Sequence, residues 1–186
     1  MKKFAVVLSG CGVFDGAEIH EAVLTLLAID RQGGSSQCFA PDMPQAHVIN
    51  HLTGQEMPET RNVLVESARI ARGAIKNLRD YKAAEYDGLI FPGGFGAAKN
   101  LSSVAFDGAA CKVTVEVERA IRETRAADKP IGALCISPTL HQNKGHGEVC
   151  IDATAKVVTT PCYMLDSTIG QIATGAENVV AAMMRL

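Results

Sequence analysis

Residues Lys129 to Leu140 read K-P-I-G-A-L-C-I-S-P-T-L, an apolar run that ends in a cysteine and is followed by Ile-Ser-Pro. The stretch Ile131 to Leu134 has the length and composition of a strand buried on both faces of a sheet. Cys135 therefore stands at the carboxyl end of a predicted strand, where a turn into a helix begins. Two interpretations are open: a nucleophile presented at the strand end, or a small buried core thiol.

Short apolar runs of the same kind recur along the chain and alternate with longer segments of helical period. This alternation is typical of a parallel sheet with helices on both faces. The predicted strands are Phe4 to Leu8, Gln37 to Ala40, Gly88 to Phe91, Ile131 to Leu134 and Lys156 to Thr159. The predicted helices are Gly16 to Arg31, Lys112 to Ala127 and Asp166 to Met184, the last with Asp166 as N-cap. Between Pro41 and Tyr86 the weaker pattern predicts loop or short strands followed by a helix from Asn62.

The chain of 186 residues is 47% hydrophobic and 20% charged, which predicts one core and a single domain over residues 1–186. Its 18 basic and 20 acidic residues form no block of one sign, so neither nucleic acid nor a membrane is an expected partner. Six cysteines without C-x-x-C spacing predict reduced thiols in a cytoplasmic protein. The start M-K-K-F-A-V-V-L-S-G-C looks like a lipoprotein cleavage box. Its apolar core is shorter than the about 7–15 residues of a signal segment, so we expect a buried strand there.

The turns that follow predicted strands are the first places to look for a site, because ligands of doubly wound sheets bind at the carboxyl ends of the strands. Gly93 and Gly94 follow one such strand in P-G-G-F-G-A-A-K-N. This turn is neither G-x-G-x-x-G nor a P-loop, so nucleotide binding is weakly supported. It is either a tight strand-to-helix turn or a place where the backbone approaches a substrate and an N–H group stabilises an oxyanion.

Two carboxylates, Glu18 and Glu21, lie three residues apart near the start of the first predicted helix, and His20 is expected to point elsewhere. Alone, such carboxylates are more often solvated charges that match the helix dipole, and only a nearby thiol would make them functional. Cys135 is the candidate thiol. A helix capped by Ser137 and Pro138 would place its N–H groups at the sulfur, which predicts a thiol pKa below the ordinary value of about 8.5.

Several segments together resemble the DJ-1/PfpI family of the class I glutamine amidotransferase-like superfamily, and within it the bacterial ElbB group (sigma cross-reacting protein 27A). They include L-S-G-C-G-V-F-D-G-A-E-I-H-E, P-G-G-F-G-A-A-K-N, K-P-I-G-A-L-C-I-S-P and K-V-V-T-T-P-C-Y-M, and with further matches they cover nearly the whole chain. The resemblance implies a flavodoxin-like α/β sandwich. It has a mainly parallel sheet, helices on both faces, and a nucleophile elbow at Cys135.

The resemblance also implies roles for individual residues. Cys135 would be the nucleophile, and Glu21, with Glu18 one turn earlier, would supply the carboxylate that hydrogen-bonds the sulfur. The N–H groups of Gly94 and Ile136 would form the oxyanion site, with Gly93 beside it.

The activity implied by the resemblance is that of glyoxalase III, a lyase that converts glyoxal to glycolate without glutathione, metal or another cofactor. The implied partners are a small dicarbonyl substrate and a second copy of the chain, as a homodimer. Two alternatives stay open: a protein deglycase, and a non-catalytic redox-sensing or binding protein.

Two features depart from the family pattern. Ile136 follows the nucleophile where amidotransferases place a histidine, so a glutaminase triad is not expected. After Cys135 only I-S-P-T-L precedes H-Q-N-K-G-H-G-E, which is too polar and glycine-rich to form the helix that an elbow requires. A parallel connection back to the sheet also needs about a dozen residues or more. We therefore expect that roughly thirty residues are missing between Leu140 and His141, either deleted in nature or absent from the printed sequence.

Overall fold

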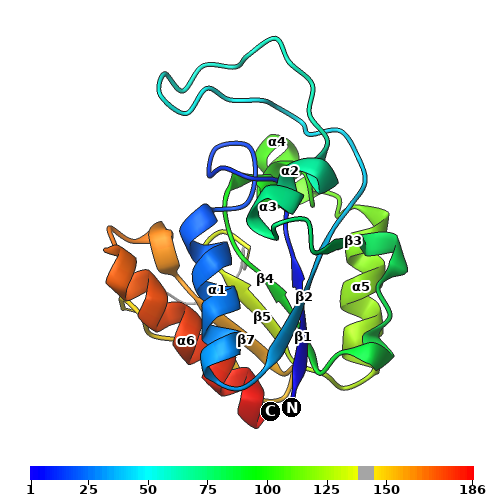
Figure 1. Cartoon of the computed structure of the whole chain (residues 1–186), viewed down its shortest axis with the longest axis vertical. Helices are drawn as coiled ribbons and strands as arrows, with labels where there is room; N and C mark the ends of the chain where they lie inside the picture. Colours follow the sequence, from blue (N-terminus) through cyan, green and yellow to red (C-terminus); the bar gives the residue numbers. More distant parts are fainter. Residues whose placement is uncertain (138–144) are drawn as a thin grey trace.

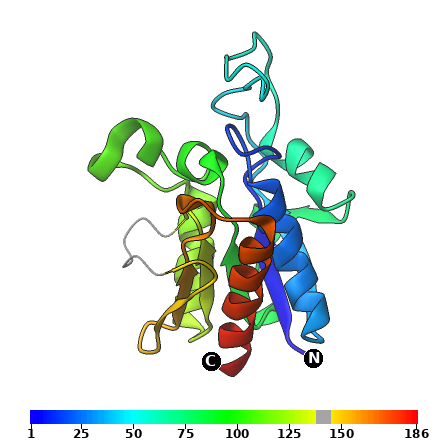
Figure 2. The same cartoon turned by 90° about the vertical axis from the view of Figure 1, so that its left-hand side faces the viewer.

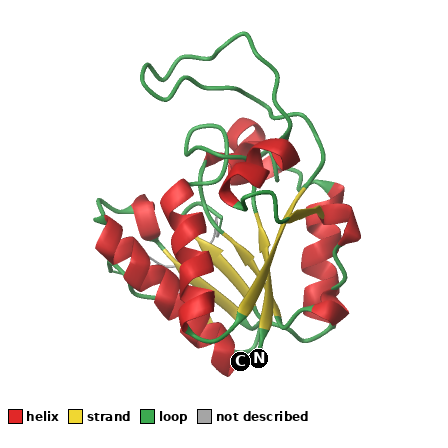
Figure 3. Cartoon of the chain, in the orientation of Figure 1, coloured by secondary structure: helices red, strands yellow, loops and turns green. Residues whose placement is uncertain are grey.

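The computed structural model describes residues 1–137 and 145–186, and these form a seven-stranded sheet of order β3-β2-β1-β4-β5-β7-β6. Neighbouring strands are parallel except for β6, which runs antiparallel to β7. Figure 3 shows the sheet between its helices, so the predicted α/β class is confirmed. The strands are β1 (Lys3–Val7), β2 (Ser35–Ala40), β3 (Ile75–Asn77), β4 (Gly88–Phe91), β5 (Ile131–Leu134), β6 (Cys150–Asp152) and β7 (Val157–Thr160).

Helices cover both faces of the sheet, with α1 and α6 packed side by side on one face and α5 on the other (Figures 1 and 2). Side chains of β1 alternate between these layers, because successive residues of a strand point to opposite faces. Phe4 and Val6 pack in the α1–α6 layer, whereas Ala5 and Val7 pack in the α5 layer. The helices are α1 (Ile19–Arg31), α2 (Val63–Ile70), α3 (Phe95–Lys99), α4 (Val104–Asp107), α5 (Val115–Ala126) and α6 (Ile169–Arg185).

The first helix begins three residues later than predicted. Glu18 has an extended backbone, and its carboxylate accepts the N–H of Glu21 at 2.7 Å. Glu18 is therefore the N-cap, and α1 begins at Ile19 and not at Gly16.

The last helix also begins later than predicted, and two strands were missed. Thr168, not Asp166, caps α6. Its hydroxyl accepts the N–H of Gln171 at 3.3 Å, and the Gln171 side chain accepts the N–H of Thr168 at 2.8 Å. This reciprocal capping box satisfies two N–H groups at once. The missed strands, β3 and β6, have three residues each and lie at the two edges of the sheet.

The carboxyl ends of the parallel strands meet at the upper edge of the sheet in Figure 1, and the segment between β2 and α2 projects beyond this edge. The buried Asn100 side chain, just after α3, ties that segment to the turn after β1. It donates to the carbonyls of Ser9 and Asp15 at 2.8 and 2.9 Å and accepts the N–H of Ala46 at 2.9 Å. The segments that follow β1, β2 and β4 are thereby fixed close together.

Candidate active site

Cys135 directly follows β5 and has a φ of 58°, in the left-handed region that residues other than glycine rarely adopt. Its N–H donates to the Thr160 carbonyl at the end of β7 at 3.0 Å, and the Ser137 hydroxyl donates to the Pro92 carbonyl at 2.9 Å. These bonds hold a backbone conformation that costs about 1–3 kcal/mol. The strand side of the predicted nucleophile elbow is therefore present, and its continuation from Pro138 lies outside the described residues.

The Glu21 side chain is fully buried against Cys135. Its Oε2 atom accepts the N–H of Gly93 at 2.9 Å, and its Oε1 atom accepts the N–H of Tyr163 at 3.4 Å. The Cys135 thiol lies beside the same carboxylate, next to Gly93. Glu18 is 7% exposed. The interpretation of these two carboxylates as solvated helix-end charges is therefore wrong.

Gly93 and Gly94 approach the other groups so closely that no side chain would fit. A Cβ atom at Gly93 would lie 2.4 Å from Cys135 Cβ and 2.6 Å from Glu21 Oε2. Gly94 has a φ of 96°, and a Cβ atom there would lie 2.3 Å from the backbone nitrogen of Glu18. The backbone of this turn therefore reaches the site directly, which favours the second of the two interpretations of the glycine-rich turn.

The backbone N–H groups of Gly94 and Ile136 are near enough to the Cys135 sulfur to act toward a lower pKa of its thiol. These are the two amides that the family resemblance assigns to an oxyanion site. The structure thus brings together all the predicted site residues, namely Cys135, Glu21, Glu18, Gly93, Gly94 and Ile136. Their catalytic roles stay predictions.

Burial dominates the ionisation of Glu21 and raises the pKa of its carboxyl group to about 7. The charge of Glu18 acts in the same direction, whereas hydrogen bonds from Cys135, Gly93 and Tyr163 act in the opposite one. Near neutral pH both the charged and the protonated form of Glu21 are present. A carboxyl group in this range is suited to take up and return a proton.

Burial likewise raises the pKa of the Cys135 thiol to about 12, and the Glu21 carboxylate contributes to the rise. The predicted lowering of this pKa is wrong, because burial and a neighbouring negative charge outweigh the two N–H groups at the sulfur. Protonation of Glu21 removes its charge and so favours the thiolate. Cys135 and Glu21 therefore compete for a proton and act as one coupled pair.

Three residues of the site were not identified from the sequence: Cys162 and Tyr163, in the turn after β7, and His20 on α1. Burial and the charge of Glu21 raise the pKa of the Cys162 thiol. The rule that selected Cys135, a reactive residue at the carboxyl end of a strand, would also have pointed to T-T-P-C-Y-M.

The prediction that His20 points away from the carboxylates is wrong. Its Nδ1 atom lies 2.9 Å from Tyr163 Oη and 3.8 Å from Glu18 Oε1. Helical spacing did not apply here, because Glu18 is extended and lies outside the helix.

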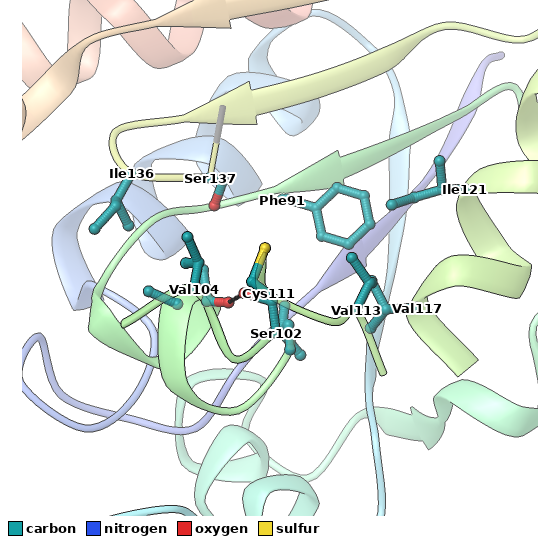
Figure 4. Close-up of a pocket in the computed structure, with 12 residues that line it drawn as sticks. Phe91, Ser102, Val104, Cys111, Val113, Val117, Ile121, Ile136 and Ser137 are labelled. Atoms are coloured by element: carbon teal, nitrogen blue, oxygen red, sulfur yellow. Dashed lines mark hydrogen bonds between the residues drawn. The ribbon is translucent and has the colours of Figure 1, made fainter. Parts of the chain in front are cut away.

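An apolar cavity of about 160 Å³ adjoins the elbow on the α5 side of the sheet (Figure 4). Ile136 and Ser137 line it, together with Phe91 of β4 and Val117 and Ile121 of α5. Its described lining includes neither Cys135 nor Glu21. The cavity is therefore separate from the space around the thiol.

Residues 1–137 and 145–186 show no sign of two other classes of site. In these ranges no group of three or more histidine, cysteine or acidic side chains is placed to hold a metal ion. None of the helices described there combines the length and the hydropathy that a membrane span requires. All six cysteines are free thiols.

Comparison with known proteins places the chain in a family, although no protein-family model matches it. The rat ES1 protein homolog, mitochondrial, is 44% identical to this chain over an alignment of 222 positions. The alignment covers 99% of this chain and 84% of the rat protein. The chain belongs to the ES1 family. Human glutamine amidotransferase-like class 1 domain-containing protein 3, mitochondrial, is also 44% identical, over 99% of this chain and 83% of the human protein.

Solved structures agree with this assignment. The ES1 chain has a TM-score of 0.94 and 34% identity to an isoprenoid biosynthesis protein with an amidotransferase-like domain from Ehrlichia chaffeensis, over 98% of this chain and 99% of that one. Drosophila melanogaster DJ-1beta has a TM-score of 0.54 at 14% identity, over 98% of this chain and 90% of that one. The second likeness shows a shared fold alone.

The names of the ES1 relatives contradict the predicted cytoplasmic location. The rat, human and zebrafish proteins are all named mitochondrial. The spacing of the cysteines indicates reducing surroundings but does not specify a compartment. The cytoplasmic prediction for this ES1 chain is therefore wrong.

Proposed function

We propose that this chain is a cofactor-independent glyoxalase of the glyoxalase III type, a lyase that converts glyoxal to glycolate, and that it is nearest to the ElbB group of its superfamily. One observation carries the proposal. A fully buried carboxyl group with a pKa of about 7 lies beside a strand-end thiol, and two backbone N–H groups act to lower the pKa of that thiol. This set places a nucleophile, an acid–base group and an oxyanion site next to one another.

The first step forms a bond between Cys135 Sγ and one aldehyde carbon of glyoxal. As the sulfur attacks, the Glu21 carboxylate accepts the thiol proton, which avoids a free thiolate with its raised pKa. The N–H groups of Gly94 and Ile136 stabilise the oxyanion on the former carbonyl oxygen. Glu21 then returns the proton to that oxygen and leaves a neutral hemithioacetal.

The second stage isomerises this adduct and releases it. The Glu21 carboxylate removes the proton from the carbon bonded to sulfur and returns a proton to the neighbouring carbon. The hydroxyl proton of the adduct passes to the second oxygen, so the carbon bonded to sulfur becomes the thioester carbonyl and the neighbouring carbon becomes the CH2OH group of glycolate. Water hydrolyses the thioester, so glycolate leaves and the Cys135 thiol is restored. The sum is glyoxal plus one water to glycolate, with no net oxidation.

The direct test is glycolate formation from glyoxal by the purified full chain without added glutathione or metal. Proton NMR follows loss of the hydrated aldehyde and appearance of the glycolate methylene signal. Turnover that saturates with glyoxal supports the proposal. Complete absence of glycolate at every pH between about 6 and 9, a range that brackets the Glu21 pKa of about 7, refutes it.

Replacing Glu21 by glutamine is expected to lower kcat by about 10²-fold or more, because an amide cannot shuttle the proton. It should also change how stability depends on pH. The folded state binds the Glu21 proton more tightly than the unfolded state, so wild-type stability falls as pH rises from about 4.5 to about 7. The Glu21→Gln variant should not show this pH-dependent loss of stability, which amounts to about 3 kcal/mol in the wild type.

Urea unfolding at pH 5 and pH 8 gives the free energy of unfolding of the variant and of the wild type. The effect is the change, between the two pH values, in the difference between these free energies. The exposed carboxylate of Glu85 supplies the control, since Glu85→Gln should leave the difference nearly unchanged with pH. A Glu21→Gln difference that is equal at both pH values would show that Glu21 does not titrate with a raised pKa.

A second candidate function is favoured by the raised pKa of Cys135, which makes the resting thiol a weak nucleophile. In this alternative the chain is a non-catalytic binding protein. A redox-sensing form, with oxidation of Cys135 as its signal, would additionally need a condition that favours the thiolate, such as protonation of Glu21. Selective oxidation of Cys135 by dilute peroxide in a chain that makes no glycolate would favour it. Turnover of glycated peptides in place of glyoxal would instead favour a protein deglycase.

We also propose that roughly thirty residues are missing between Leu140 and His141 relative to the family, a position outside the described residues. The alignment with the rat relative spans 222 positions, at least 36 more than the 186 residues of this chain, which supports a difference of this size somewhere in the aligned region. An intact mass well above 19.7 kDa would show that the printed sequence is incomplete. A mass equal to 19.7 kDa would show that the residues are absent from the protein itself.

A further inference from the structure

The strongest unassigned feature beside the proposed site is the contact between His20, Tyr163 and Glu18. His20 Nδ1 lies 2.9 Å from the Tyr163 hydroxyl and 3.8 Å from Glu18 Oε1. The two rings are tilted, with centroids 6.0 Å apart. Glu18 and His20 are two residues apart at the start of α1, and the fold brings Tyr163 to them from the turn after β7.

Both partners of His20 are also joined to Glu21. The Glu18 carboxylate accepts the backbone N–H of Glu21 at 2.7 Å, and the backbone N–H of Tyr163 donates to Glu21 Oε1 at 3.4 Å. His20 is therefore joined to Glu21 through two intermediate residues: Glu18, which binds the Glu21 backbone N–H, and Tyr163, whose backbone N–H binds the Glu21 carboxylate.

Burial changes stepwise along this set. The Glu21 side chain is fully buried, the Glu18 side chain is 10% exposed and the His20 side chain is 49% exposed. A buried carboxyl group that gains and loses a proton must exchange it with solvent through neighbouring groups. Imidazole is the side chain that both accepts and donates protons near neutral pH.

We propose that His20, oriented by the Tyr163 hydroxyl, is the residue through which the buried Glu18–Glu21 carboxylate pair exchanges protons with solvent. His20 acts through the carboxylates and does not touch the substrate. The turnover part of this inference rests on the proposed function, whereas the titration part does not.

The two ring nitrogens have different surroundings. Nδ1 faces the Tyr163 hydroxyl and the Glu18 carboxylate, and a nearby carboxylate favours a proton on that nitrogen. Nε2 is then free to accept a proton from water and gives an imidazolium. Transfer of the Nδ1 proton to Glu18 Oε1, 3.8 Å away, requires one bridging water or a small closing movement, and it restores neutral imidazole. One proton thus enters at Nε2 and one leaves at Nδ1.

Few ionisable groups face these residues in the described chain. His20 faces Glu18 at the N-cap of α1 and Tyr163 after β7. Glu21 faces Glu18, the Cys135 thiol after β5, and the Cys162 thiol and Tyr163 after β7. An imidazolium at His20 is the cation nearest to the carboxylate pair among these groups, so its loss should make the carboxylates harder to ionise.

The first experiment needs no turnover. The rate at which iodoacetamide alkylates Cys135 is measured from pH 5 to pH 9 by peptide mass spectrometry in wild type, His20→Gln and Tyr163→Phe. Glutamine keeps a polar partner for Tyr163 but cannot carry a proton. The pH at which Cys135 reactivity changes should rise by about 0.5 unit in His20→Gln, and by less in Tyr163→Phe.

The matched control is His146→Gln. His146 Nδ1 also contacts a hydroxyl, that of Ser167 at 2.7 Å, and Ser167 in turn donates to the Cys162 carbonyl at 3.1 Å. The His146→Gln variant should leave the pH profile of Cys135 alkylation unchanged. An unchanged profile in His20→Gln, or an equal shift in His146→Gln, overturns the inference whether or not the chain has glyoxalase activity.

The second experiment measures turnover of glyoxal in the same variants. His20→Gln should lower kcat by about tenfold with little change in KM. Added imidazole should restore part of the loss in proportion to its concentration. A shifted alkylation profile in a chain that makes no glycolate supports proton exchange through His20 and refutes the proposed function. If the kcat of His20→Gln equals that of the wild type and does not change with added imidazole, proton exchange through His20 during turnover is refuted.

Discussion

Cys135→Ala is expected to abolish glycolate formation, with kcat/KM at least about 10³-fold below wild type. The methyl side chain cannot form the hemithioacetal, and neither Glu21 nor the two N–H groups at the sulfur can replace the nucleophile. Stability should change little, because alanine and cysteine meet the same backbone strain at a φ of 58°. Glyoxal turnover and thermal unfolding of the same preparation measure both quantities.

The control for this variant is Cys150→Ala, a partly buried cysteine in β6 outside the site. It should retain wild-type turnover. Wild-type rates in Cys135→Ala would contradict the proposed mechanism outright, whatever the behaviour of the control.

Gly94→Ala is expected to destabilise the fold by at least about 3 kcal/mol, through overpacking added to backbone strain. Gly94 has a φ of 96°, and a Cβ atom would lie 2.3 Å from the Glu18 nitrogen and 2.4 Å from the Gly16 carbonyl oxygen. Both obstacles are backbone atoms, so no side-chain rotation relieves them. Urea unfolding measures the loss, and failure to fold at 37 °C is its extreme form.

Gly73 provides a matched control, because its φ of 81° is similar and a Cβ atom there would have no other atom within 4 Å. Gly73→Ala should therefore cost only the strain of a left-handed alanine, about 1–2 kcal/mol. Equal losses in the two variants would show that φ alone, and not the close approach to α1, makes glycine necessary at position 94.

The central strands were predictable because each is a continuous apolar run buried on both faces, as in Gly88 to Phe91. β3 and β6 were not, because I-K-N and C-I-D at the sheet edges carry neither an apolar run nor an alternation. The start of α1 and the N-cap of α6 were misplaced for a related reason. Several polar residues precede each helix, and only the fold decides which of them turns back onto the first N–H groups.

The grouping of Cys135, Glu21 and Gly94 was predictable because the carboxyl ends of parallel strands lie at one edge of the sheet. The family resemblance then specified the individual residues. The sign of the thiol pKa shift was not. It depends on how deeply the sulfur is buried and on the distance to a carboxylate from another part of the chain, and neither is encoded near Cys135. His20 was missed because its partner Tyr163 is 143 residues away in the sequence.

The three-residue edge strands bear on how two copies of this chain can associate. β3 and β6 close the sheet at both sides, and each offers a neighbour too few backbone groups for a continuous intersubunit sheet. If the homodimer expected from the family resemblance forms, these edges favour an interface of helices and loops. Its interface would then depend on side chains more than on backbone pairing, so single surface substitutions should be able to dissociate it without unfolding either subunit.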